Sequence, residues 1–328
     1  MARLILHVGA HKTGTSYLQR ILHLNRDLLA RHGVIYPDLG PNPAHHILTT
    51  PWIDNPEIAP HWYGPGGPEG LWQRIIADLA DRDATVILSA EPFSRMAPQA
   101  VDMVDLAARC RRFDDVTVVY VARNQVELAQ SIWLQRAKTG GAPPVDRFVA
   151  HALEAGLASG IPLDHHAVYQ HLRRGFAHRD IRLADYHQLR TGPDGLLGGF
   201  CQLTGLELPL DDLTPLPAEA ANISPDPLAT LLATRLTHPD PPSAGMVAWV
   251  GRRLNQRYPK QRRCIFTQEE IASLVRKFNA SNRAVEALSH SGDTAFSVTA
   301  AQSGDWVTRD TLTWEIWADL ARGAYHAA

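Results

Sequence analysis

Short apolar runs alternate with amphipathic stretches along the first two thirds of the chain. The runs at 4–8, 85–89 and 116–121 are dominated by Val, Ile and Leu, which is typical of strands buried on both faces of a parallel sheet. Between these runs, apolar residues recur at helical spacing, for example over 18–29 and 71–79. This alternation predicts an α/β fold in three layers, with a central parallel sheet and helices on both faces.

The second half of the chain continues with one more strand and becomes helical. We expect a last strand over 180–186 and helices over 164–176 and 268–288. From this pattern we expect a core over residues 1–206 and a helical C-terminal extension over residues 207–328. The extension is expected to pack on the core, so that the chain forms a single structural domain overall.

The first strand leads into a loop with two glycines, one lysine and three hydroxyl side chains. This segment, residues 9–16, reads GAHKTGTS and is called the Lys12 loop below. A helix is expected to start directly after it, and a helix N-terminus directs free amides and positive potential at an anion. Thr15 or Ser16 is expected to cap that helix with its hydroxyl. In the Walker P-loop the lysine follows the second glycine, whereas Lys12 precedes Gly14.

Two further polar side chains follow predicted strands. Glu91 lies just past the strand at 85–89, and Arg123 follows the strand at 116–121. Parallel sheets bind ligands beyond the carboxyl ends of their strands, so both side chains should face the crevice of the Lys12 loop. Ser131 comes two helical turns after Arg123, where both could reach one phosphate. A surface carboxylate at the start of a helix is the alternative for Glu91.

A long segment, residues 38–68, separates two of the predicted elements. It is rich in Pro, Gly, His and Trp and lacks sustained periodicity. It could form a wall of an acceptor pocket, with His46 over the crevice, or it could be a surface excursion held by Trp52 and Trp62. The sequence leaves both interpretations open.

Three segments together resemble the sulfotransferases that use 3′-phosphoadenosine-5′-phosphosulfate (PAPS). The order of residues 12–17, KTGTSY, resembles their 5′-phosphosulfate-binding loop, and the longer string HVGAHKTGTSYLQ looks most like the bacterial, carbohydrate-type branch. LSAEPFS resembles the segment that carries a candidate base. YVARNQVELAQSIWLQ looks like the 3′-phosphate-binding segment. The resemblance covers roughly residues 4–206 and implies a P-loop-like fold.

The resemblance implies transfer of a sulfuryl group from PAPS to an acceptor hydroxyl, of a saccharide or another small metabolite. Lys12 would neutralise the leaving oxygens, Arg123 and Ser131 would hold the 3′-phosphate, and Glu91 would take the acceptor proton, with His46 as the second candidate. The residues expected to bind PAPS are His11, Lys12, Thr13, Gly14, Thr15, Ser16, Arg123 and Ser131. An ATP-dependent phosphoryl transferase on a variant P-loop and a non-catalytic nucleotide-binding protein are the alternatives.

Composition and charge argue against several other classes of protein. The formal charge of −2 argues against a broad nucleic-acid-binding surface. The three cysteines form no CxxC pair, and the sixteen histidines form no zinc motif, so we expect neither a disulfide framework nor a metal. His165, like the basic residues Arg262 and Arg263, is expected to be solvated. The chain has no long apolar run and no signal-peptide pattern, which predicts a cytoplasmic protein without an integral membrane segment. Its oligomeric state is not predicted.

Overall fold

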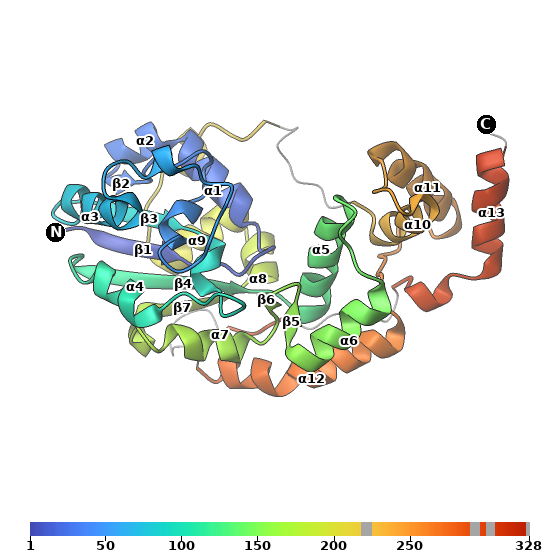
Figure 1. Cartoon of the computed structure of the whole chain (residues 1–328). Coiled ribbons are helices and arrows are strands. Elements are labelled where there is room, and N and C mark those ends of the chain that lie inside the picture. Colours follow the sequence, from blue (N-terminus) through green and yellow to red (C-terminus); the bar gives the residue numbers. More distant parts are fainter. Residues whose placement is uncertain (218–224, 289–295, 300–305, 326–328) are drawn as a thin grey trace. The chain divides into compact units, whose positions relative to one another are not determined.

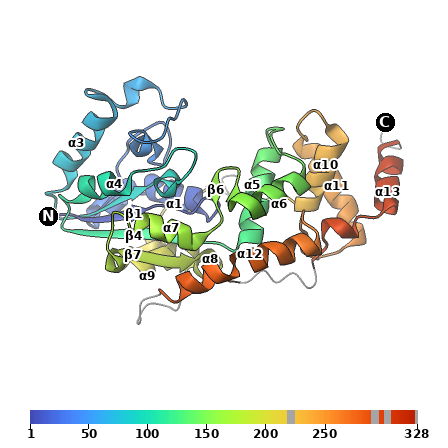
Figure 2. The ribbon, with the colours of Figure 1, turned by 60° about the horizontal axis from the view of Figure 1, so that its bottom comes forward.

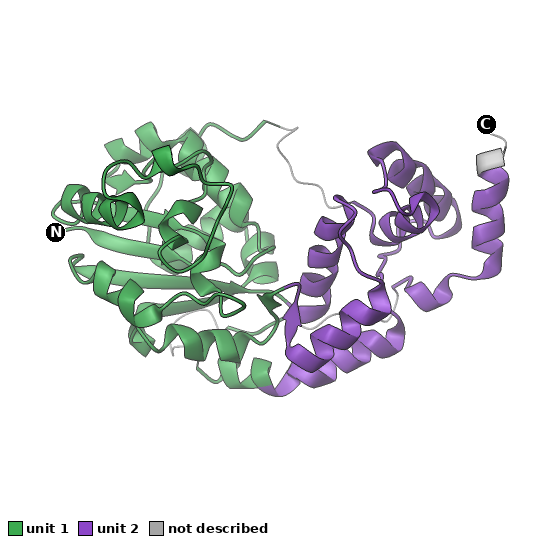
Figure 3. Cartoon of the chain, viewed as in Figure 1, with its two compact units in different colours: residues 1–123, 160–221, 281–299 green, residues 124–159, 222–280, 300–328 purple. Residues whose placement is uncertain are grey.

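The computed structural model describes residues 1–217, 225–288, 296–299 and 306–325. The chain folds into two compact units, which Figure 3 shows in different colours. Unit 1 comprises residues 1–123, 160–221 and 281–299, and unit 2 comprises residues 124–159, 222–280 and 300–328. The expected division into a core over residues 1–206 and an extension over residues 207–328, together forming one structural domain, stays a prediction.

A five-stranded sheet forms the centre of unit 1. Its strand order is β2-β3-β1-β4-β7, and every neighbouring pair is parallel. The strands are β1 (Arg3–His7), β2 (Val34–Ile35), β3 (Thr85–Ser89), β4 (Asp115–Ala122) and β7 (Ile181–Asp185). The expected central parallel sheet is confirmed.

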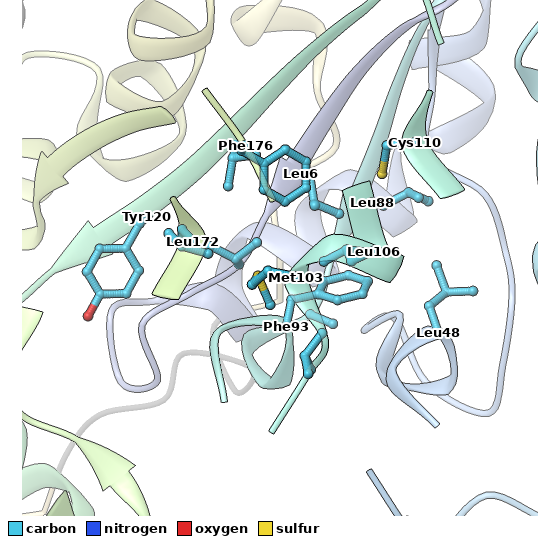
Figure 4. Close-up of a cluster of buried hydrophobic side chains, with 14 of the residues drawn as sticks. Leu6, Leu48, Leu88, Phe93, Met103, Leu106, Cys110, Tyr120, Leu172 and Phe176 are labelled. Carbon is cyan, nitrogen blue, oxygen red and sulfur yellow. The ribbon is translucent and has the colours of Figure 1, made fainter. Parts of the chain in front are cut away.

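Side chains of the strands alternate between two buried clusters, because successive residues of a strand point to opposite faces of a sheet. Leu4 and Leu6 belong to one cluster, part of which Figure 4 shows, and Ile5 belongs to the other. Helices cover both faces (Figure 1 and Figure 2), so the three layers are confirmed. The cluster that contains Leu4 and Leu6 also receives side chains from the helices α3 (Gly67–Leu79), α4 (Met103–Cys110) and α7 (His165–Leu172). The cluster that contains Ile5 receives side chains from the helices α1 (Thr15–Leu24), α2 (Arg26–Arg31) and α9 (Gly195–Thr204).

Unit 2 is built mainly from helices. They are α5 (Gln125–Ala137), α6 (Val145–Ala155), α10 (Pro227–Thr237), α11 (Ala244–Arg257), α13 (Trp314–Tyr325) and most of α12 (Gln268–Glu286). The shorter elements of the chain are α8 (Tyr186–Thr191), β5 (Leu157–Ala158) and β6 (Ile161–Pro162). Within the described residues, no helix has the length and apolar character to cross a bilayer.

The expectation that the late basic residues are solvated is wrong for Arg263, whereas the Arg262 side chain is 61% exposed, in agreement with it. The Arg262 guanidinium donates to Glu127 at 2.7 Å and lies over the Trp306 ring at 4.6 Å. Arg263 forms an ion pair with Asp226, and its side chain is only 6% exposed. These arginines therefore hold parts of unit 2 together.

The long segment before α3 is held to unit 1 by tryptophans. The Trp72 indole N–H donates to the Leu48 carbonyl at 2.9 Å, and the Trp52 indole N–H donates to Asp105 at 3.0 Å. The Arg109 guanidinium lies 5.0 Å from the Trp52 ring and 5.6 Å from the Trp72 ring. Trp62, in contrast, is 41% exposed, so only one of the two tryptophans expected to hold the segment does so.

We predict that Trp72→Ala destabilises the protein by about 3–5 kcal/mol, because it leaves a large cavity and an unpaired Leu48 carbonyl. Urea unfolding followed by circular dichroism would measure the loss. Trp62→Ala is the matched control, and its effect should stay within about 0.5 kcal/mol. Equal losses in the two variants would contradict this account of how the segment is held.

Candidate functional site

Three neighbouring strands deliver the predicted site residues to one edge of the sheet. Strand β1 pairs with β3 on one side and with β4 on the other, all in parallel. The Lys12 loop follows β1, Glu91 follows β3 at the start of the 3₁₀ helix η3 (Glu91–Ser94), and Arg123 follows β4. Since the carboxyl ends of parallel strands meet at one edge, the sheet itself brings these three segments together.

Arg123 contacts the Lys12 loop directly. Its Nη1 donates to the Lys12 carbonyl at 2.8 Å, and its guanidinium lies 5.0 Å from the centre of the Tyr186 ring. Lys12 has a left-handed backbone with φ 62°, which costs energy in a residue with a Cβ. The hydrogen bond from Arg123 stabilises this conformation. Both side chains are half-buried, so their charges are held near the surface of unit 1.

The hydroxyls of the Lys12 loop are directed differently from our expectation. Thr13 Oγ1 donates to the Ala10 carbonyl at 2.7 Å, and Thr15 Oγ1 donates to Glu91 Oε1. Both threonines are buried, whereas Ser16 is exposed. The predicted hydroxyl cap of α1 is wrong, because Gly14 occupies the N-cap without a side-chain bond. The two threonine hydroxyls shape the loop, which leaves Ser16 and the first amides of α1 to meet an anion.

Gly14 is required by the space around it as well as by its backbone. Its φ is 77°, and a Cβ built there would lie 2.3 Å from Leu196 Cδ2 and 3.3 Å from Tyr186 Cε2. A larger residue would therefore have a strained backbone and would require the Leu196 side chain to move.

Glu91 is a buried carboxylate with three side-chain donors. It is 7% exposed. Its Oε1 accepts from Thr15, and its Oε2 accepts from Gln19 Nε2 at 3.3 Å and from His46 Nε2 at 2.8 Å. Burial raises the pKa of Glu91, but the hydrogen bond and charge of His46, with smaller effects of His11 and Thr15, outweigh it and hold the pKa below the ordinary range. Glu91 is therefore ionised at neutral pH.

The two candidate bases of the sequence form one pair. His46 begins the 3₁₀ helix η1 (His46–Thr49), and its side chain is 33% exposed while that of Glu91 is 9% exposed. Glu91 can accept from the Nε2–H of His46 in either protonation form of the ring, and in the neutral form this hydrogen bond leaves Nδ1 as the nitrogen with a lone pair.

Three further histidines lie in this part of unit 1, of which His7 and His45 are buried and His11 is half-buried. His7 Nδ1 lies 2.9 Å from Ser89 Oγ, and His45 Nδ1 accepts from the Ser89 amide at 3.0 Å. Burial lowers the pKa of His7, of His11 and of His45 to about 4 in each case. They are neutral under ordinary conditions, so they add hydrogen bonds but no charge. Sequence reasoning assigned no role to His7 or His45, and the one signal for His7 was a polar residue inside an apolar strand.

Two expectations concern residues outside this cluster. Ser131 lies on α5 of unit 2, and its role toward a 3′-phosphate stays a prediction. In the described part of the chain, no group of three or more His, Cys, Asp or Glu side chains is arranged to hold a metal ion.

No protein-family model matches this chain, and no curated protein matches it. Several solved structures are similar to it at a low level of identity, among them two sulfotransferases. A sulfotransferase from Alicyclobacillus acidocaldarius is 16% identical with a TM-score of 0.40, over 75% of this chain and 94% of that one. Mouse sulfotransferase SULT7A1 in complex with PAP is 12% identical with a TM-score of 0.42, over 88% of this chain and 86% of that one. The assignment of this site therefore depends on contacts among the chain's own residues and not on these similar structures.

The buried histidines predict that the protein loses stability as the pH falls from 6.5 toward 4. In this window the unfolded chain protonates His45 at its ordinary pKa of 6.5, whereas the folded chain resists until about 4. Urea unfolding at several pH values should show that His45→Asn, which keeps an acceptor for the Ser89 amide, reduces this loss. The reduction should be on the order of 3 kcal/mol.

His32→Asn is the matched control, since His32 is exposed, and it should follow the pH dependence of the unmodified protein. A pH dependence that is the same in all three proteins would show that His45 is not the group being titrated.

Proposed function

We propose that this chain transfers a sulfuryl group from PAPS to an acceptor hydroxyl. One observation supports this most: the Arg123 guanidinium donates to the Lys12 carbonyl, so two anion-binding segments that the sequence suggested separately belong to one site. One lysine just before a helix N-terminus and one arginine bonded to its carbonyl suit a ligand with two separate anionic groups.

The residues present fit such a donor. The Lys12 ammonium and the first amides of α1 would hold the 5′-phosphosulfate, with Ser16 as an exposed hydroxyl. Arg123 offers a rigid fork of donors for the 3′-phosphate, and the sequence resemblance suggests Ser131 as a further donor. PAPS supplies a sulfuryl group already activated on a phosphate. No metal is needed in this scheme, since Lys12 carries the charge that Mg²⁺ provides in kinases.

Within the site, Lys12 and the α1 amides stabilise negative charge on the phosphate oxygen as its bond to sulfur breaks. The acceptor oxygen forms the new bond to sulfur, and its proton has to leave to a base. We assign that proton to His46 Nδ1, with Glu91 holding the ring and balancing the positive charge that develops on it. Both oxygens of Glu91 already accept hydrogen bonds inside the protein, which makes it the less accessible acceptor. Glu91 as the base itself is the alternative.

The acceptor is proposed as a hydroxyl of a saccharide or another small metabolite. This choice and the relation to the bacterial carbohydrate-type branch rest on the sequence resemblance, whereas the cytoplasmic location is proposed because the sequence has no long apolar run. His46 lies within the long segment, residues 38–68, which Trp52 holds in place. This segment would therefore bring the base to the acceptor.

Calorimetric titration with 3′,5′-adenosine bisphosphate, AMP and ATP·Mg²⁺ tests the donor. The bisphosphate should bind about 10- to 100-fold more tightly than AMP, because a charge-assisted contact contributes about 1.5–3 kcal/mol. Arg123→Ala should remove most of this preference. Arg82→Ala, which changes an exposed arginine bonded within its own helix end, should leave it unchanged. Equal or tighter binding of ATP·Mg²⁺ would replace the proposal by a phosphoryl transferase.

Slow sulfuryl transfer from PAPS to water, measured as release of the bisphosphate, tests the base without a known acceptor. His46→Gln keeps an amide donor for Glu91 but has no basic nitrogen, and it should lower the rate about 10²- to 10⁴-fold. His61→Gln, an exposed position in the same segment, should have no effect. Near-normal turnover in His46→Gln combined with loss in Glu91→Gln would assign the proton to Glu91. Absence of release in the unmodified protein, despite tight bisphosphate binding, would indicate a non-catalytic nucleotide-binding protein.

A further inference from the structure

His165 connects the interior of unit 1 to the backbone of Arg123. It is fully buried, at the first position of α7, which corrects the expectation that this histidine is solvated. Its Nε2 lies 2.8 Å from the Arg123 carbonyl, and its Nδ1 lies 2.8 Å from the Tyr120 hydroxyl. We propose that His165, oriented by Tyr120, is a positioning residue that fixes Arg123 for the anion it binds. This inference rests on the proposed function.

The chemistry of the two contacts fixes the state of the ring. A carbonyl oxygen can only accept, so the His165 hydrogen must sit on Nε2 and point at Arg123. Nδ1 then carries a lone pair, which accepts from the Tyr120 hydroxyl. Burial lowers the pKa of His165, which keeps this neutral tautomer. The Arg123 carbonyl thus selects the tautomer, and Tyr120 orients the ring by donating to Nδ1.

Arg123 needs such support because of its place in the chain. Strand β4 ends at Ala122, where the last pair with β7 is formed, so the sheet ladder no longer sets the backbone of Arg123. Its side chain is long, and a small rotation at the backbone displaces the guanidinium by a larger distance. His165 holds the carbonyl, while the Lys12 carbonyl and the Tyr186 ring guide the guanidinium. Arg123 is therefore held both at its backbone carbonyl and at its guanidinium group.

The start of α7 is itself well anchored. Asp164 caps the helix by accepting from the Ala167 amide at 2.9 Å, and the same carboxylate accepts from Ser281 Oγ. Val168 and Leu172 of α7 are buried in the cluster that contains Leu4 and Leu6. The imidazole therefore sits on a rigid element, which is what a positioning residue requires.

The test measures how much the 3′-phosphate adds to affinity, as the ratio of the dissociation constants of AMP and 3′,5′-adenosine bisphosphate. His165→Asn places its amide where Nδ1 lies and does not reach Arg123, so the ratio should fall about five- to tenfold. His165→Gln places its amide nitrogen near the position of Nε2 and should restore most of the ratio. Tyr120→Phe removes the hydroxyl that orients the His165 ring and should lower the ratio by a smaller factor.

His171→Asn is the matched control, because His171 is also a buried histidine on α7 and its ring bonds to the Val101 backbone instead. It should leave the ratio unchanged even if it lowers the melting temperature. A ratio that falls equally in His165→Asn and His171→Asn would reflect general loosening of α7 and would overturn the inference. An unchanged ratio in His165→Asn would overturn the inference alone, whereas absence of any preference in the unmodified protein would overturn the proposed function and this inference with it.

Discussion

A carboxylate inside a protein requires donors on every side, and this requirement organises the site around Glu91. Its partners come from two separate parts of unit 1: Thr15 and Gln19 from α1, and His46 from η1. Glu91 itself follows β3. The carboxylate therefore holds the first helix and the long segment against the end of the sheet, and its charge explains why threonine and glutamine face inward at the start of α1. Loss of its charge would leave several polar groups without partners at once.

A second network meets the first at the Lys12 loop. Arg123 reaches the loop through the Lys12 carbonyl and reaches α7 through its own carbonyl, which His165 holds. The loop therefore lies between two sets of hydrogen bonds, one centred on Glu91 and one on Arg123. Each set is built from side chains that are distant in sequence and brought together by neighbouring strands. Under the proposed function, the first set serves the acceptor and the second serves the donor nucleotide.

The sequence was sufficient to predict the layers of unit 1 and the strand ends that carry Lys12, Glu91 and Arg123, because buried parallel strands have a strong apolar pattern and topology fixes where they end. It was not sufficient to predict the direction of a side chain. A threonine after a glycine can cap a helix or turn toward a buried acid, and Thr15 does the second because Glu91 lies beside it. His165 looked solvated because its partners, Tyr120 and Arg123, are far from it in the chain.

The left-handed backbone of Lys12 has a consequence for how a ligand would arrive. The conformation is stabilised by Arg123 and by the inward bond of Thr13, both of which belong to the protein itself. The loop therefore acquires its shape during folding, and an incoming anion does not have to order it. Binding to such a preorganised surface avoids much of the entropic cost of fixing flexible residues. At this end of the site, the loop would then need no rearrangement before the anion binds.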